Sequence, residues 1–465
     1  MYSAWQRFTL SDLNLYRWRG ASFLYRLVGL LSDWRQGSWL LQWAETIGLL
    51  LVSLVLVTSP FVSTSLIGLL LIACVSYCFL FVATDNTRIV LTPVHLLVFM
   101  YWGIATVATA FSPVKEAAFS GWVKLTLYII FFTLASLVLR SATLRSWVIG
   151  IFLHVALVVS VYGIRQEIFG AEQLATWNDP TSQLAQDTRA YSYLGNPNLL
   201  AGYLLTAVAL SLAAFFVWRL WLPRILAATM ILVNTACLYF TDSRGGWIGL
   251  LALVLVFLLL LRVWWDAYLP SFWRKWLLPL VFGGMAAFLI TAAIFVEPLR
   301  LRVMSIFAGR EDSSNNFRMN VWAAVFEMIR DRPLIGIGPG NDAFNAIYPL
   351  YQRPRFTALS AYSIFLEIAV ETGFIGLSAF LWLMTVTYQH GYKTLTYLRE
   401  SGNKQGYWLI ASLAAIAGML AHGVVDTVWY RPQISSLWWL SMAIVASFFQ
   451  LSTTSSTTAK PYNDV

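Results

Sequence analysis

Continuous apolar runs, each roughly 17 to 25 residues long, recur along most of the chain. A helix of this length crosses the hydrocarbon core of a bilayer. The runs lack the alternation of apolar and polar residues that a membrane β-strand requires, and a helix satisfies its backbone hydrogen bonds within the segment. The sequence therefore predicts an all-α, polytopic membrane helix bundle.

The composition leaves little room for a soluble domain, because 59% of the residues are hydrophobic and only 11% are charged. The net charge of +9 does not indicate a nucleic-acid partner, since the basic residues are scattered over short loops. Cys74, Cys78 and Cys237 lie inside apolar runs without metal-ligand spacing. We therefore expect a lipid bilayer as the main partner, and neither a metal nor a cofactor is indicated.

The runs predict twelve spans, whose ends are accurate to a few residues. The expected spans cover about 43–58, 65–84, 94–111, 122–139, 146–164, 198–218, 224–241, 245–264, 276–296, 362–388, 407–428 and 434–451. This division makes 1–42 an N-terminal cytoplasmic segment, 43–296 the first nine spans, 297–361 a large extracytoplasmic loop, 362–451 the last three spans and 452–465 a disordered cytoplasmic tail.

The distribution of Lys and Arg predicts the orientation. With the N-terminus inside, most basic residues fall in inner segments, and the short outer loops hold only Lys115, Arg165, Arg189, Arg244 and Arg431. Cytoplasmic loops are the ones enriched in basic residues. We therefore expect a multi-pass protein of the inner (plasma) membrane with both termini in the cytoplasm.

The large loop 297–361 contains eight arginines and no lysine. Guanidinium groups donate paired hydrogen bonds to phosphate, carboxylate or bicarbonate. A solvated network with the acidic residues of the same loop is an equally good interpretation. Apolar residues at helical spacing predict an amphipathic helix over 316–330, with Arg318 near its start. The following PLIGIGPGND resembles an anion-binding turn only weakly, so a structural turn is favoured.

Arg244 stands in the short turn TDSRGGWIG between two expected spans. Gly245 and Gly246 would leave its guanidinium and the helix start open to an anion. Pairing with Asp242 or with lipid headgroups is the alternative. We favour an anion-binding role, because polar residues confined between spans tend to be functional.

Other polar residues are expected at the same side of the membrane. Asn196 and Asn198 begin the sixth span, and are grouped with Arg244 and Arg318 as candidate anion or substrate ligands. Possible supporting residues are His422, Asp426, Glu367, Glu371 and Tyr362. His422 and Asp426 are four residues apart, which places them on one helical face near the outer end of the eleventh span, where the carboxylate could hold the tautomer of the imidazole. A hydrogen bond between helices is the more ordinary interpretation of that pair.

Four stretches together resemble the O-antigen ligase and polymerase superfamily: GNPNLLAGYL, TDSRGGWIGLL, FRMNVWAAVFEMIRDRPLIGIGPG and SIFLEIAVETGFIGL. The resemblance implies transfer of a glycan from a polyprenyl pyrophosphate carrier, without metal, using extracytoplasmic arginines and a histidine. Arg244 and Arg318 match the arginines. Where ligases commonly have His-Asn at the start of the tenth span, this chain has Tyr362 and Ser363. A phenol with a pKa of about 10 is a poor general base, so no catalytic residue is assigned.

The N-terminal segment and the SAYSIFLE stretch resemble, more narrowly, the cyanobacterial IctB family of proposed bicarbonate transporters. This resemblance predicts inorganic-carbon (bicarbonate) accumulation, with a small anion on the arginines. A ligase- or polymerase-like glycosyltransferase with a lipid-linked pyrophosphate glycan is the alternative, and a non-catalytic partner of another carbon-uptake system is the third. The absence of paired Gly or Pro breaks argues against direct transport. The sequence specifies no oligomeric state.

Overall fold

The computed structural model describes residues 2–11, 27–85, 91–171, 189–295, 297, 300, 304 and 309–448. The expected tail 452–465 lies outside the described residues, as do parts of the N-terminal segment, of the segment between the fifth and sixth expected spans, and of the large loop 297–361. The α-helices are α1 (Tyr2–Phe8), α2 (Ser32–Gly37), α3 (Trp39–Gln42), α4 (Ala44–Thr58), α5 (Thr64–Thr84), α6 (Pro93–Ala110), α7 (Lys115–Val138), α8 (Ala142–Phe169), α9 (Pro197–Val217), α10 (Trp221–Phe240), α11 (Arg244–Trp265), α12 (Ser271–Phe295), α14 (Ser313–Asp331), α15 (Asn341–Ile347), α16 (Ile364–Glu400), α17 (Gly406–His422) and α18 (Pro432–Ser447). Short 3₁₀ turns are η3 (Ser192–Leu194), η4 (Gly309–Glu311), η5 (Tyr348–Leu350) and η6 (Val428–Tyr430).

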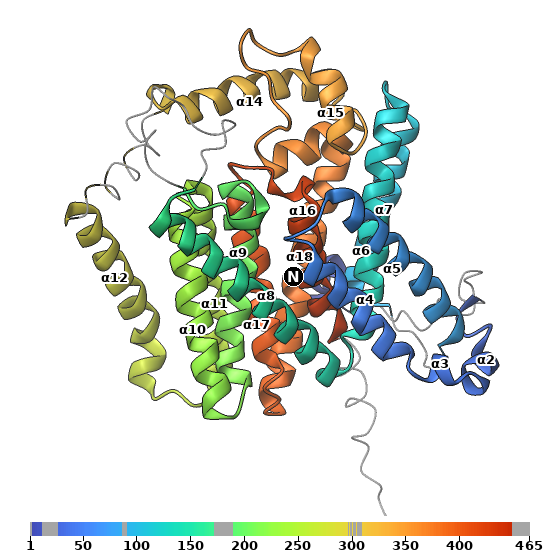
Figure 1. Ribbon diagram of the computed structural model, residues 1–465, viewed down its shortest axis with the longest axis vertical. Helices are drawn as coiled ribbons and strands as arrows, with labels where there is room; N and C mark the ends of the chain where they lie inside the picture. The colour runs from blue at the N-terminus through green and yellow to red at the C-terminus, as the bar shows by residue number, and fades with distance from the viewer. Residues whose placement is uncertain are drawn as a thin grey trace, which may run out of the picture.

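The arrangement confirms the expected all-α membrane bundle (Figure 1). Within the described residues, eight helices are long and apolar enough to cross a membrane, namely α5 to α11 and α16. Apolar α4 and α17 are shorter, and α12 and α18 occupy the other two ranges where spans are expected. Multi-pass membrane insertion follows from these helices.

Helix α9 forms the centre of the bundle and is buried along almost its whole length. It contacts α8, α10, α11, α17 and α18. Small residues allow the closest approach in this core: a Cβ added to Gly249 of α11 would lie 2.8 Å from the carbonyl oxygen of Gly418 in α17. Helices packed in lipid commonly use small residues in this way. The glycines thus bring the start of α11 close to the end of α17.

The end of the bundle at which α9, α11 and α16 begin, which we call the Arg244 end, is covered by α14 and α15 (Figure 1). Helix α14 confirms the amphipathic helix expected over 316–330. Its apolar face packs against η5 and α16, in a separate apolar cluster that also includes residues of α15. Because that face is buried in protein, α14 caps the bundle.

The glycine-rich segment after α14 is a structural connection to α16. The backbone N–H groups of Ile337 and Gly338 donate to the carbonyl oxygens of Val370 and Glu371, each at 2.9 Å. Gly373 interrupts the helical backbone of α16 with φ +67°, and a Cβ there would lie 2.2 Å from the carbonyl carbon of Leu334. Only glycine fits such a contact. These N–H groups therefore bind the protein's own backbone.

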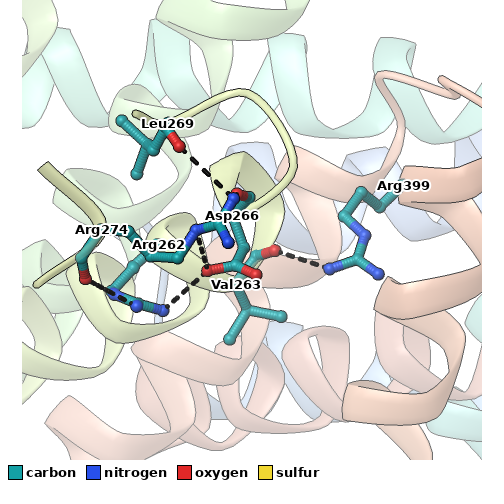
Figure 2. Close-up of polar contacts among 6 residues, drawn as sticks. All are labelled: Arg262, Val263, Asp266, Leu269, Arg274 and Arg399. Carbon is teal, nitrogen blue, oxygen red and sulfur yellow. Dashed lines mark hydrogen bonds and ion pairs between the residues drawn. The ribbon is translucent and has the colours of Figure 1, made fainter. Parts of the chain in front are cut away.

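The opposite end of α11 carries a basic network that involves α12 and α16 (Figure 2). Asp266 pairs with Arg262 at 3.2 Å and with Arg274 at 3.5 Å, and Arg399 donates to the carbonyl oxygen of Val263 at 3.1 Å. Basic side chains on the last carbonyls of a helix are favourable. At this end the cations therefore bind groups of the protein itself.

Candidate functional site at the Arg244 end

Arg244 is the first residue of α11 and is placed there by a tight turn. Asp242 adopts a left-handed backbone (φ +52°), and the Ser243 hydroxyl accepts the backbone N–H of Gly246 at 3.2 Å. A serine in this position caps the helix. A Cβ on Gly246 would lie 2.6 Å from that of Ala201 in α9. The turn TDSRGG therefore fixes Arg244 at the junction of α9, α11 and α17.

The partner of Arg244 comes from the large loop. Its Nη2 donates to Oδ1 of Asp312 at 2.9 Å, and both side chains are mostly buried. Asp312 also caps α14, since Oδ1 accepts the backbone N–H of Asn315 at 2.8 Å. A charge-assisted hydrogen bond of this kind contributes about 1.5–3 kcal/mol when shielded from water. The ion pair therefore joins the start of α11 to the start of α14.

Arg318 lies in the second turn of α14 and faces the same junction. Its Nη1 donates to Ser314 Oγ at 2.9 Å, and its Nε has no hydrogen-bond partner among the described residues. Burial lowers the pKa of the guanidinium, as does the nearby charge of Arg244, while Asp426, Tyr362 and Asp312 raise it. The structure thus brings the two candidate arginines within electrostatic reach of one another.

The side chains of Asn196 and Asn198 have different hydrogen-bond partners. Asn196 caps α9, because its Oδ1 accepts the backbone N–H groups of Asn198 at 2.8 Å and Leu199 at 3.3 Å. Asn198 Nδ2 donates to Asp426 Oδ2 at 2.7 Å, and its Oδ1 accepts from Arg189 Nη2 at 3.4 Å. Asn198 therefore links Asp426 to a third arginine, whereas the side-chain oxygen of Asn196 is bonded to its own helix.

His422 and Asp426 do not share a helical face, and this expectation from their spacing is wrong. Helix α17 ends at His422, six residues before the predicted end of the span, and Asp426 lies in the turn that follows. Gly423 forms the C-cap, and its Cβ would lie 2.0 Å from Ile364 Cδ1, so the chain leaves the helix beside α16. Asp426 Oδ1 instead accepts the backbone N–H of Thr427 at 2.8 Å.

The imidazole of His422 is nevertheless part of the site. It is fully buried, and neither ring nitrogen has a hydrogen-bond partner among the described residues. Glycines on two helices surround it: a Cβ on Gly245 would lie 2.6 Å from Cδ2, and one on Gly202 would lie 3.7 Å from Nδ1. Asp426 and Arg318 are within electrostatic reach. Helix packing thus places a histidine against Gly245, the residue that follows Arg244, a proximity that the spacing in the chain did not reveal.

Tyr362 also lies at the junction, in a left-handed conformation with φ +49°. Its ring meets Phe317 edge to face at 5.5 Å between centroids. Burial, followed by the negative charge of Asp426, raises the pKa of the phenol to about 12. An acid this weak leaves almost no phenolate at neutral pH. Tyr362 is therefore not a general base at neutral pH.

Glu367 and Glu371 line a separate cavity of about 580 Å³, whose lining includes neither Arg244 nor Arg318. Glu367 Oε2 accepts the backbone N–H of Ala361, and Glu371 Oε1 accepts that of Gly340, both at 2.6 Å. Each carboxylate thereby fixes a segment that leads into α15 or α16. The two glutamates therefore lie at the same end of the bundle without joining the arginines.

Sequence reasoning missed Asp312 and Arg189 as parts of the site. Asp312 precedes SSNN at the start of an amphipathic stretch, which is a recognisable N-cap pattern. That pattern predicts the cap but not the pairing with Arg244, 68 positions away in the chain. Arg189 offers no such signal, because its contacts to Asn198 and to the Thr241 carbonyl (3.1 Å) arise only from packing.

The fold and the site define a membrane helix bundle that holds three arginines, two aspartates and a buried histidine at one end. Residues 229–381 match the family model described as O-antigen ligase. This range contains Arg244, Arg318, Tyr362, Glu367 and Glu371, and it ends before His422 and Asp426. The match supports the resemblance to the O-antigen ligase superfamily. It gives no support to the narrower IctB resemblance, which stays a prediction. The curated proteins contain no significant match to the chain.

Proposed function

We propose that this protein is a membrane glycan transferase of the O-antigen ligase type, which uses a glycan linked to a polyprenyl pyrophosphate. The observation that carries the proposal is the convergence of Arg244, which pairs with Asp312, and Arg318, which lies within electrostatic reach of Arg244, inside the range that matches the family model. Two guanidinium groups offer paired donors with the geometry of a diphosphate. A diphosphate would replace Asp312 as the partner of Arg244.

In the proposed reaction an acceptor hydroxyl oxygen attacks the anomeric carbon of the glycan. The bond between that carbon and the pyrophosphate oxygen breaks, and the lipid pyrophosphate leaves with the electron pair. Arg244 and Arg318 stabilise the charge that develops on the leaving group. Fixed donors aimed at developing charge are usually the largest contribution to such catalysis.

The proton of the acceptor hydroxyl must pass to a base at the same site. Asp426 is the carboxylate within reach of both Arg318 and Tyr362, and we assign it as the proton acceptor. His422 is fully buried and lies within electrostatic reach of Asp426. We assign His422 a positioning role, in which it supports the turn that carries Asp426. Asn198, bonded to Asp426 at 2.7 Å, holds the carboxylate in place.

The orientation predicted from the basic residues also bears on this proposal. It places the Arg244 end outside the cytoplasm, where lipid-linked glycans are joined to acceptors by the superfamily that the chain resembles. An impermeant reagent that labels a cysteine introduced beside Arg244 from the outside supports this orientation. Labelling from the cytoplasm alone contradicts it.

The experiment is a transfer assay with purified protein in proteoliposomes and a radiolabelled lipid pyrophosphate glycan. We expect labelled product with the wild type and with Arg330→Lys, an exposed arginine on α14. We expect loss of product with Asp426→Asn, and with His422→Gln a lower turnover number with little change in KM. Absence of transfer with every acceptor tested overturns the proposal.

Bicarbonate accumulation rests on the IctB resemblance alone. The same arginines could hold bicarbonate, but the family match supports a glycan ligase and not transport. Uptake of labelled bicarbonate into the same proteoliposomes therefore serves as the parallel arm of the assay. Uptake that depends on Arg244, without glycan transfer, would favour the transport hypothesis instead.

A further inference from the structure

The cavity that contains Glu367 and Glu371 has no part in the site described above. It lies among α5, α7, α15, α16 and α18, and its volume of about 580 Å³ is in the range of small-ligand pockets. Its wall reaches the arginine site through two segments. Ile364 and Thr427 line the cavity, while Tyr362 and Asp426, one or two residues earlier, belong to the arginine site. A ligand in the cavity would therefore lie next to the place where transfer is proposed.

Most of the unpartnered polar atoms of the cavity are hydrogen-bond acceptors. Glu367 and Glu371 each use one carboxylate oxygen to bind a backbone N–H, and the second oxygen of each has no hydrogen bond within the described part of the chain. Two further lining residues have a polar atom without a partner there: Asn341 Oδ1 is an acceptor and Trp429 Nε1 is a donor. Buried polar atoms are normally satisfied, so the unpartnered Asn341 Oδ1 and Trp429 Nε1 indicate a polar ligand.

The rest of the wall is aromatic. Trp429 and Trp438 lie against each other with ring centroids 3.9 Å apart, and Tyr101, Tyr128 and Trp439 also line the cavity. Aromatic faces bind flat apolar surfaces and, in Trp and Tyr, add a polar edge. The ligand thus needs an apolar face together with several hydroxyl groups.

The charges of the lining argue against an ionic ligand. Lys124 and Arg431 stand against Asp342, Glu367 and Glu371, and Lys124 is paired with Asp342 at 2.9 Å. Because Lys124 and Asp342 are paired, an organic cation would meet the charge of Arg431, and an anion would meet the two glutamates. A neutral molecule with hydroxyl groups avoids both costs.

We infer that this cavity binds a neutral sugar ring of the acceptor, with hydroxyl groups donating to Glu367 and Glu371 and an apolar ring face on Trp429 or Trp438. This inference rests on the proposed function for the role of the sugar as acceptor. The binding itself can be tested without donor and without transfer. An experiment can therefore refute sugar binding in this cavity without refuting the proposed function, and the reverse.

The test measures binding of methyl glycosides of glucose, galactose and mannose by saturation-transfer-difference NMR, with the purified protein in nanodiscs. Tetramethylammonium and glucuronate serve as cationic and anionic probes. We expect saturation of at least one neutral glycoside, and competition between the glycosides that bind. Saturation of tetramethylammonium or glucuronate alone, or of no probe, overturns the inference.

Two variants locate the binding. The first variant is Glu371→Gln. It keeps one side-chain oxygen to accept the Gly340 N–H, and it replaces the second oxygen by an NH₂ group. We expect at least tenfold weaker glycoside binding. Glu400→Gln, at the exposed far end of α16, is the matched control. Unchanged binding in Glu371→Gln overturns the assignment of the glutamates.

The second variant fills the cavity. Gly68 of α5 lines it, and a Cβ at Gly68 would meet no atom within 4 Å, so Gly68→Leu introduces a side chain into open space. We expect glycoside binding to fall at least tenfold while the melting temperature stays unchanged or rises, since glycine is a poor helix residue. Gly103→Leu in α6 is the matched control, because a Cβ there also meets nothing within 4 Å and Gly103 lies outside the cavity. Equal glycoside binding in both leucine variants overturns the assignment of the binding site to this cavity.

Discussion

The imidazole of His422 packs directly on Gly245, so closely that a Cβ at Gly245 would lie 2.6 Å from Cδ2 and 3.1 Å from Nε2 of the ring. Gly245 follows Arg244, so this contact places the end of α17 against the start of α11, where the proposed anion site lies. The glycine is required here for space rather than for its backbone conformation. His422 and the start of α11, which carries Arg244, therefore form one packed unit.

Gly245→Ala should disturb this unit. The added methyl group must displace either the imidazole or Val425 Cγ2, which would lie 3.1 Å away. Overpacking of this kind costs about 1–3 kcal/mol. We expect a lower melting temperature and at least a tenfold loss of glycan transfer. Gly150→Ala is the control, since a Cβ at Gly150 meets nothing within 4 Å. Full activity in Gly245→Ala would show that the position of His422 is unimportant.

Arg244→Lys and Arg318→Lys test the paired donors. Each substitution keeps the positive charge but removes the planar geometry that binds a diphosphate through two hydrogen bonds. Loss of one preorganised donor typically lowers turnover by about 10²–10³-fold. We expect losses of this size in kcat, measured with the lipid pyrophosphate glycan, and no change in the Arg330→Lys control. Activity close to wild type in both lysine variants would remove the arginines from the mechanism.

Asp312→Asn tests whether the carboxylate competes with the ligand for Arg244. Asparagine still caps a helix as well as aspartate does, so α14 should stay folded. The neutral amide binds Arg244 less strongly. We expect inorganic pyrophosphate, measured by isothermal titration calorimetry, to bind severalfold more tightly than to the wild type. Glu327→Gln, an exposed change in the same helix, is the control. Weaker binding in Asp312→Asn would mean that the ion pair holds the site open rather than blocks it.

The sequence predicted most of the fold because its determinants are local. Apolar runs fix where helices form, and all twelve expected ranges contain a helix. Helices α7, α8 and α16 extend past the expected ends, since a helix can continue beyond the hydrocarbon core. The end of α17 at His422 depended instead on a tertiary contact, because Gly423 lies against Ile364 of another helix. The local sequence of residues 423–428 could not predict that the helix ends at His422.

The site was predictable only in part, for a related reason. The types of residue predicted that the arginines bind an anion, since guanidinium chemistry is a property of the side chain itself, and that role stays a prediction. Their partners were set by packing between segments far apart in the chain, such as Arg244 with Asp312 and Asn198 with Asp426. Counting the spans from the N-terminus predicted that the arginines and the glutamates lie at the same end of the bundle. It did not predict that the glutamates line a separate cavity, away from the arginines.

Tyr362→Phe should leave the pH dependence of transfer unchanged between pH 6 and 9. Burial, followed by Asp426, raises the pKa of Tyr362 to about 12, above the value of about 10 for an unfolded tyrosine. The phenol is therefore neutral in both states below about pH 9. Ionisation in the unfolded chain lowers stability only as the pH rises from about 10 to 12. The measurement is kcat across this pH range. Loss of an alkaline limb in Tyr362→Phe would show that the phenol does titrate during turnover.

Tyr362→His places a histidine at the position where the ligases that this chain resembles commonly have one. The left-handed backbone at position 362 (φ +49°) accommodates histidine better than most residues, so the change should not strain the chain. An imidazole with a pKa near 6.5 can accept a proton at neutral pH, whereas the phenol with a pKa of about 12 cannot. We expect transfer to increase, and the increase to disappear in Tyr362→His combined with Arg318→Lys. Tyr362→Gln, which has a side chain of similar reach but no titratable group, is the control. An equal gain with glutamine would attribute the effect to space, and no gain with histidine would mean that the geometry at this position differs from that of the ligases.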